Sequence, residues 1–212
     1  MKTENKYENI NFTRERNNLN ASKIYLTCIH FSSKRWDILL ETHKLHGIVF
    51  RFFNTKEEHK LFRYNSKKNL LYILSENRPK ILEIINRLKV NRTDIEIKQY
   101  TIEKYTNIEK HKNYKFNILV NPTYRDSKTR KVLSNDWGEW IYRKSRENGF
   151  EIQEIKKIEE MTYIGKNNTP IYGVDIDGVL SVFDIEKFSE CMLKGIGRSK
   201  GHGFGFLILD RE

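Results

Sequence analysis

The sequence predicts an α+β fold with antiparallel sheets, in which the element order β-α-β-β-α-β occurs twice. Two observations carry this prediction. Short runs rich in β-branched and aromatic residues alternate with two helical stretches in the first half of the 212-residue chain, and a second set in the same order follows. This order is that of the ferredoxin-like, or RRM-like, arrangement. The two halves share no close sequence identity, so only the order of elements repeats.

The first half supplies one complete set of elements. Residues 23–31 have the composition of a strand, and Ser32 or Ser33 can cap a helix that runs to about His46. Pro79 can open the second helix, because the first helical position needs no N–H group. Further strands are predicted from short apolar runs at residues 48–53, 60–64, 70–74 and 94–100.

The second half repeats the set. Ser134 is predicted to cap a helix that ends at Asn148-Gly149, and Asp184 to cap another that ends at Lys194. The strands of this half are predicted at residues 114–121, 150–158, 171–181 and 203–209. We therefore divide the chain into a polar, flexible extension and two ferredoxin-like domains, over residues 1–20, 21–105 and 106–212.

The net charge indicates a polyanionic partner. Lys and Arg total 39 against 28 Asp and Glu, which gives a formal charge of +11. Neutralising phosphates with release of counterions drives binding of such proteins to nucleic acid. No apolar run of about 18 residues could span a bilayer, and no signal-like stretch opens the chain. We expect a soluble, cytoplasmic protein without a membrane partner, in which Cys28 and Cys191 are reduced core thiols.

Glycines gather near the C-terminal end, where Gly195 to Gly205 hold five of the eleven. Glycine turns backbone N–H groups outward without obstruction, and Arg198 and Lys200 add positive charge, so this loop can cradle a phosphate backbone. A tight turn that merely requires glycine is the alternative. The spacing fits neither a Walker A loop nor a dinucleotide fingerprint. The predicted RNA contacts in the loop are Gly195, Gly197, Arg198, Lys200, Gly201, His202 and Gly203.

A basic loop follows the first strand of the second half. A cationic hairpin can enter the groove of A-form RNA and contact its phosphates, and Tyr124 beside it can stack on a base. A solvated turn is the alternative interpretation. The predicted RNA contacts here are Arg125, Lys128, Arg130 and Lys131.

Several motifs spread over residues 22–211 point to one known family. They are Gly195-Ile196-Gly197 with Lys200, Gly203, Gly205 and Leu207; Asn121-Pro122; Gly149-Phe150 after a Trp helix; Gly178-Val179-Leu180 with Asp184; and Leu45-His46. Together they resemble the CasE-type CRISPR-associated endoribonucleases, the repeat-processing subunits of type I-E Cascade. The resemblance implies two tandem ferredoxin-like domains. The function it implies is cleavage without metal at the 3′ base of the precursor stem-loop, leaving a 2′,3′-cyclic phosphate.

The resemblance also implies a catalytic residue and partners. The catalytic histidine of the family falls on His46, whereas His43 stands where the family commonly has Tyr, and Gly47 where it often has a basic residue. The implied partners are the CRISPR repeat stem-loop, in precursor and mature crRNA, and the other Cascade subunits. The first departure leaves the auxiliary catalytic group open, and the second removes an expected phosphate contact.

The residues also support this chemistry independently of the family. Histidine suits a base for the 2′-hydroxyl and an acid for the departing 5′-oxygen, and His43 and His46 share a helix face at this spacing. Basic neighbours would lower an imidazole pKa. A histidine that caps a helix or faces solvent is the alternative. We expect no metal or cofactor, since no HExxH or cysteine cluster occurs. Asp175 and Asp177 alternate on a strand as a candidate carboxylate pair, with one of them facing solvent as the simpler interpretation.

The sequence leaves three functions open. The first is a CasE-type endoribonuclease with His46 as general base. The second is a non-catalytic subunit that holds an RNA hairpin, and the third is a ferredoxin-like interaction module whose charge only aids solubility. Tight, salt-dependent binding of a repeat hairpin would exclude the third.

Overall fold

The computed structural model describes residues 24–32, 42–53, 60–89, 91–102, 108–125, 130–132 and 136–210. The predicted extension, residues 1–20, lies outside this described part. Within the part described, no helix is long and apolar enough to cross a membrane.

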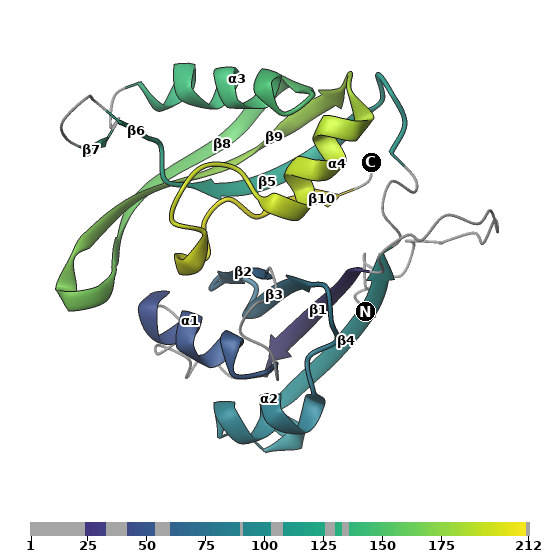
Figure 1. Ribbon diagram of the computed structural model, residues 1–212, viewed down its shortest axis with the longest axis vertical. Helices are drawn as coiled ribbons and strands as arrows, with labels where there is room; N and C mark the ends of the chain where they lie inside the picture. The colour runs from purple at the N-terminus through teal and green to yellow at the C-terminus, as the bar shows by residue number, and fades with distance from the viewer. Residues whose placement is uncertain are drawn as a thin grey trace, which may run out of the picture.

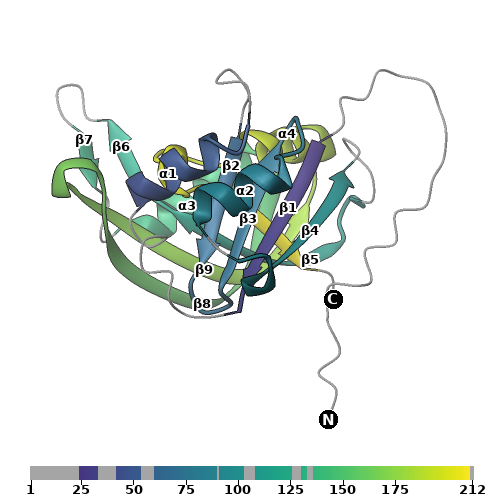
Figure 2. The same ribbon diagram turned by 90° about the horizontal axis from the view of Figure 1, so that it is seen from below.

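The first ferredoxin-like unit, called the N-terminal unit here, is confirmed. Its elements are β1 (Ile24–Phe31), α1 (Thr42–Phe50), β2 (Lys60–Asn65), β3 (Leu70–Ser75), α2 (Ile81–Leu88) and β4 (Ile95–Ile102). The strands pair antiparallel in the order β2-β3-β1-β4. Both helices lie on one face of this sheet (Figures 1 and 2). Alternate strand residues such as Ile29 and Phe31 pack against them in one buried cluster.

The C-terminal unit has the same topology with a hairpin inserted. Its sheet pairs antiparallel in the order β10-β5-β9-β8, and β6 pairs with β7 outside that sheet. Buried aromatic and aliphatic side chains join α3 and α4 to the sheet in a second cluster. The elements are β5 (Asn113–Val120), β6 (Thr123–Arg125), β7 (Arg130–Val132), α3 (Trp137–Glu147), β8 (Phe150–Ile164), β9 (Pro170–Val182), α4 (Ile185–Lys194), the 3-10 turn η4 (Lys200–His202) and β10 (Leu207–Asp210).

The two units face each other with their helices outward (Figure 1). A third buried cluster, which includes Leu61 and Leu74 of the first sheet and Phe206 before β10, fills the space between them. Arg63 of β2 also forms an ion pair with Asp175 of β9, at 2.8 Å. The interface is therefore partly apolar and partly ionic.

The end of α1 differs from the prediction. The strand predicted at residues 48–53 is wrong, because residues 48–50 complete α1 and a turn follows. Leu45, Val49 and Phe52 follow one another at spacings of four and three and are all buried in the first cluster. The helical period thus prevails over the β-branched composition of this stretch. His46 consequently lies about one turn before the end of the helix rather than at its end.

Ser32 stays a predicted cap of α1, because the residues that follow it, 33–41, lie outside the described residues. Its hydroxyl donates to the carbonyl oxygen of Asp94 at 2.8 Å, and its backbone N–H donates to the same oxygen at 3.0 Å. Ser32 therefore ties the end of β1 to the turn before β4. Ser33, the other predicted cap, lies outside the described residues.

Two other helix starts are shifted along the chain. The α3 helix begins after Asp136, whereas Ser134 lies outside the described residues. The α2 helix begins after Lys80, so Pro79 precedes the helix instead of opening it. The predicted cap of α4 is confirmed, because Asp184 Oδ1 accepts from the Lys187 N–H at 3.1 Å.

The bounds of β8, β9 and β10 also differ from those predicted. The final strand begins at Leu207, because Gly203 and Gly205 have φ of 86° and 78°, which a strand does not allow. The hairpin of β8 and β9 is longer than predicted. Figure 1 shows its far end reaching toward α1.

Candidate nucleic-acid interface

His46 is held on α1 by aromatic contacts. Its ring stacks on Phe50, one turn further along the helix, with centroids 4.2 Å apart and planes at 29°. The centroid of the Phe62 ring of β2 lies 6.3 Å from that of the imidazole, with the planes at 57°. The imidazole is half-buried, and this burial lowers its pKa. The sequence predicted the direction of this shift, but its cause is burial rather than neighbouring charge.

The glycine loop, residues 195–205, is anchored at its base to the C-terminal unit. The Ile196 N–H donates to the Gly205 carbonyl at 2.8 Å, and the Gly205 N–H donates to Leu119 of β5 at 2.7 Å. Ile196 and Phe204, which lie near the two ends of the loop, are buried and hold these ends in place. Phe204 also meets Tyr163 of β8 edge-on at 5.2 Å. The base of the loop is thus fixed to the C-terminal unit.

The tip of the loop meets α1 and β2 of the other unit. A Cβ atom added to Gly201 would lie 3.3 Å from Cδ2 and 3.6 Å from Nε2 of His46. A Cβ atom on Gly203 would lie 3.5 Å from the Phe62 carbonyl oxygen. Glycine therefore lets the backbone approach the imidazole. His46 and Gly201 lie about 155 positions apart in the chain, and they face each other across the interface between the units. The two units therefore form one site together.

The polar residues of the loop do not all face one way. Ser199 Oγ donates to Asn121 Oδ1 at 3.3 Å, while Arg198 and His202 are half-buried. Lys200 lines a separate cavity of about 290 Å³ against α4, and burial lowers the pKa of its ammonium group. His46 is not among the residues that line this cavity.

The basic hairpin is confirmed as a backbone hairpin. Its strands pair Tyr124 with Lys131 and Arg125 with Arg130. Lys128, and the side chains of Arg125, Arg130 and Lys131, lie outside the described residues. Their predicted role as RNA contacts stays a prediction.

Trp140 of α3 joins the root of this hairpin to the glycine loop. Its Nε1–H donates to the Thr123 carbonyl at 3.3 Å. Its ring also lies against Gly197, where an added Cβ would come within 2.9 Å. Trp140 is only 2% exposed, and through these two contacts it connects the hairpin and the glycine loop to α3.

The structure describes the side chains of the predicted carboxylate pair, Asp175 and Asp177, but not that of His43. The backbone of His43 belongs to α1, but its side chain lies outside the described residues. Asp175 and Asp177 lie on the same face of β9, because the Asn117 amide donates to both at 2.8 Å. Neither lies at a turn, because both belong to β9, and both are half-buried. Among the described residues, no group of three or more His, Cys, Asp or Glu side chains could hold a metal ion.

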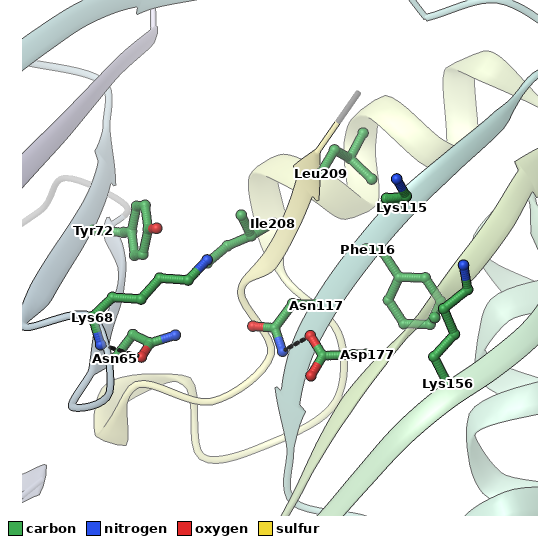
Figure 3. A pocket seen from close by; sticks show the side chains of 11 residues that line it. Asn65, Lys68, Tyr72, Lys115, Phe116, Asn117, Lys156, Asp177, Ile208 and Leu209 are labelled. Atoms are coloured by element: carbon green, nitrogen blue, oxygen red, sulfur yellow. Dashed lines mark hydrogen bonds between the residues drawn. The ribbon is translucent and has the colours of Figure 1, made fainter. Parts of the chain in front are cut away.

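A second hollow lies between the units, on the side of β5 and β9. It is a cleft of about 200 Å³ that contains the bonded pair Asn117 and Asp177 (Figure 3). Lys68 and Tyr72 approach it from the N-terminal unit, and Ile208 of β10 lies between the two sets.

Sequence reasoning missed the aromatic support of His46. The Phe50 and Phe62 rings lie beside the imidazole, and the Lys60 ammonium lies 4.9 Å from the Phe50 ring and 4.6 Å from the Phe53 ring. Assigning residues 48–53 to a strand hid the relation between His46 and Phe50. Their spacing of four was the signal that could have revealed it.

Known proteins match this chain over most of its length. A protein-family model described as "CRISPR associated protein" matches residues 22–211. No curated protein is significantly similar to the chain in sequence.

Several solved structures share the fold. Thermus thermophilus Cse3 bound to an RNA representing a pre-cleavage complex superposes with a TM-score of 0.74 at 15% identity, over 88% of this chain and 98% of that one. Cas6e from Escherichia coli K-12 gives 0.63 at 19% identity, over 89% and 100%. A chain of a CRISPR RNA-guided surveillance complex gives 0.61 at 18%, over 89% and 100%. These likenesses show a shared tandem ferredoxin-like fold.

Proposed function

Since this chain belongs to the family of CRISPR associated proteins, we propose that it is a metal-independent endoribonuclease. It binds the stem-loop of CRISPR precursor RNA and cleaves at the 3′ base of that stem-loop. The observation that carries the proposal is the approach of Gly201 to His46, which sets a base beside a loop suited to phosphate.

His46 acts as the general base. Burial lowers its pKa, so the imidazole is neutral and able to accept a proton near pH 7. It takes the proton from the 2′-hydroxyl while that oxygen attacks phosphorus. The bond from phosphorus to the 5′-oxygen breaks, the 5′-oxygen receives a proton, and the other product ends in a 2′,3′-cyclic phosphate. His43 is the candidate donor of the second proton.

The glycine loop and the basic hairpin bind the RNA. The tip of the loop faces the scissile phosphate next to His46, with Arg198 and His202 as candidate contacts. The hairpin contacts phosphates of the stem through Arg125, Lys128, Arg130 and Lys131. Lys200 contributes least to this surface, because it lines the cavity against α4.

The protein stays bound to its product and assembles with other subunits. This part of the proposal is supported by the fold shared with a chain of a CRISPR RNA-guided surveillance complex. The net charge of +11 also favours retention of an RNA hairpin.

The test is cleavage of a labelled repeat hairpin in excess EDTA, with binding measured in parallel. Wild type is expected to cut and to leave a cyclic phosphate, whereas His46→Ala binds the hairpin but cuts at least about a hundredfold more slowly. His30→Ala, which changes an exposed histidine on β1, is the matched control and should cut like wild type. An RNA with a 2′-deoxy nucleotide at the cleavage site should bind without being cut.

A different result would support the second function. If wild type binds tightly and never cuts, the protein is a non-catalytic subunit that holds an RNA hairpin. Gly47, where the resembled family often has a basic residue, is the feature that favours this outcome, because space for a longer side chain is open there.

A further inference from the structure

The distance between His46 and the glycine loop depends on how the two units are joined. His46 belongs to α1 of the N-terminal unit, and Gly201 belongs to the loop of the C-terminal unit. No covalent or hydrogen-bonded connection between these two residues fixes them in the described part of the chain. Their approach must therefore be maintained by contacts elsewhere in the interface.

The ion pair of Arg63 and Asp175 is a buried polar contact between the units. One guanidinium nitrogen of Arg63 donates to both oxygens of Asp175, each at 2.8 Å, and the Arg63 side chain is only 2% exposed. Asn117 donates to the same carboxylate at 2.8 Å and orients it. The ion pair of Lys67 with Glu159 also bridges the units, but Lys67 is 61% exposed.

The chemistry of this pair suits positioning better than stability. The Nε and one terminal nitrogen of Arg63 are buried without a hydrogen-bond partner among the described residues. A buried cation that is only partly satisfied gains less than well-packed apolar residues would in the same space. The pair nevertheless adds a directional contact between β2 and β9 to the apolar packing of the third cluster.

Strand β2 connects the ion pair directly to His46, because Phe62 stands next to Arg63 in the strand. Phe62 precedes Arg63, and its side chain points to the opposite face of the sheet, into the cluster with α1. The Phe62 ring lies beside His46, and its carbonyl oxygen lies beside Gly203. A shift of β2 relative to β9 would thus move the imidazole and the loop tip apart.

We infer that Arg63 and Asp175 form an interunit latch that sets the position of His46 against Gly201 and so act as positioning residues for RNA cleavage. The inference rests on the proposed role of His46 for its effect on rate. The placement of the two groups can be measured without any activity.

The decisive variants are Arg63→Met and Arg63→Lys. Met keeps most of the apolar stem and removes the ion pair, whereas Lys keeps a donor for Asp175, since only one nitrogen of Arg63 makes that contact. We expect the single-turnover cleavage rate of Arg63→Met to fall about tenfold or more, because a small misplacement of a catalytic group carries a large cost. Arg63→Lys should stay within about threefold of wild type.

Binding and charge need their own controls. The dissociation constant of the repeat hairpin should change by less than about threefold in both variants, which separates positioning from lost affinity. Arg87→Met removes a cation from an exposed ion pair within α2 and should leave rate and affinity unchanged. An equal loss of rate in Arg87→Met would overturn the latch, since it would indicate a general effect of charge.

The second readout is NMR of the His46 ring protons in the free protein, assigned by their loss in His46→Ala. They should shift in Arg63→Met and return toward the wild-type position in Arg63→Lys. Unchanged ring resonances, or cleavage by Arg63→Met at the wild-type rate, would overturn the inference. If wild type does not cleave at all, the proposed function fails, and the ring resonances still decide the latch.

Discussion

At the scale of single residues, Gly201 has the clearest requirement. A side chain there would press on the His46 ring at 3.3 Å, which is tighter than ordinary van der Waals contact. We expect Gly201→Ala to displace the imidazole and to lower the cleavage rate about tenfold, while the hairpin still binds. Single-turnover cleavage and equilibrium binding on the same samples measure the two effects.

Gly138 is the matched control for that change. An added Cβ at Gly138 of α3 meets nothing within 4 Å, so alanine fits there. Gly138→Ala should cleave normally and stabilise the protein by about 0.5–1 kcal/mol, since glycine is unfavourable inside a helix. If Gly201→Ala behaves like this control, the contact with His46 has no part in catalysis.

The pH dependence of cleavage follows from the burial of His46. Burial disfavours the charged imidazolium, so the pKa of His46 in the folded protein is lower than in the unfolded chain. The neutral base should remain available down to a pH below the ordinary value of about 6.5, and the rate should fall only as pH decreases further. The stability contributed by this group is present above its unfolded pKa and lost as pH falls through its folded pKa.

A rate–pH profile and an NMR titration of the His46 ring should give the same low pKa. Opening the site, as Arg63→Met is inferred to do, should move both upward together. A midpoint at or above the ordinary histidine value in wild type would contradict the assignment of a buried neutral base.

At the scale of elements, the basic hairpin should govern affinity rather than chemistry. Its cations are predicted to contact phosphates of the stem, and each such contact releases counterions on binding. The double change Lys128→Gln and Arg130→Gln should weaken binding and reduce the slope of log K against log salt by about 1 per cation. Bound RNA should still be cut at nearly the wild-type rate.

This prediction is checked by titrations at several salt concentrations. Arg87→Gln on α2, far from the hairpin in the chain, serves as the control for charge loss. If neither the affinity nor the slope changes, the hairpin does not contact the RNA, and the solvated-turn interpretation holds.

The elements also show what the sequence could and could not predict. The order of elements in both units followed from hydrophobic runs and caps such as Asp184, because these signals are local. The end of α1 did not, because Ile48 and Val49 favour a strand and only their packing against the first cluster makes them helical. The pairing of His46 with Gly201 depends on the interface between units, which no local pattern encodes.

The identity of the site was accessible only in part. His46 was found through the resemblance to a family, and the glycine loop through its composition. Arg63 gave no signal, since a basic residue inside a predicted strand is ordinary until its partner across the interface is known. Asp175 was noticed, but its contact with Arg63 comes from tertiary structure alone.

At the scale of the whole molecule, the third cluster makes two units behave as one. Leu61 of β2 is fully buried there, and its methyl groups lie 3.0 and 3.2 Å from the position of a Cβ on Gly195, at the base of the glycine loop. Leu71 of β3 is also fully buried, but it belongs to the cluster inside the N-terminal unit. The two leucines therefore form a matched pair that differs in whether the packing crosses the interface.

Leu61→Ala and Leu71→Ala should each cost about 2–5 kcal/mol of unfolding free energy, because both leave a cavity in a dense core. Their effects on cooperativity should differ. Leu61→Ala weakens the coupling between the units, so its calorimetric transition should broaden or split and hydrogen exchange at β10 should accelerate. Leu71→Ala should lower the melting temperature of the N-terminal unit without separating the glycine loop from that unit.

The same two variants should differ in activity. Since the site exists only where the units meet, Leu61→Ala should lose cleavage at temperatures below its main transition, whereas Leu71→Ala should lose cleavage only on unfolding. Identical losses in both variants would mean that the interface follows the unit cores and does not set the site independently.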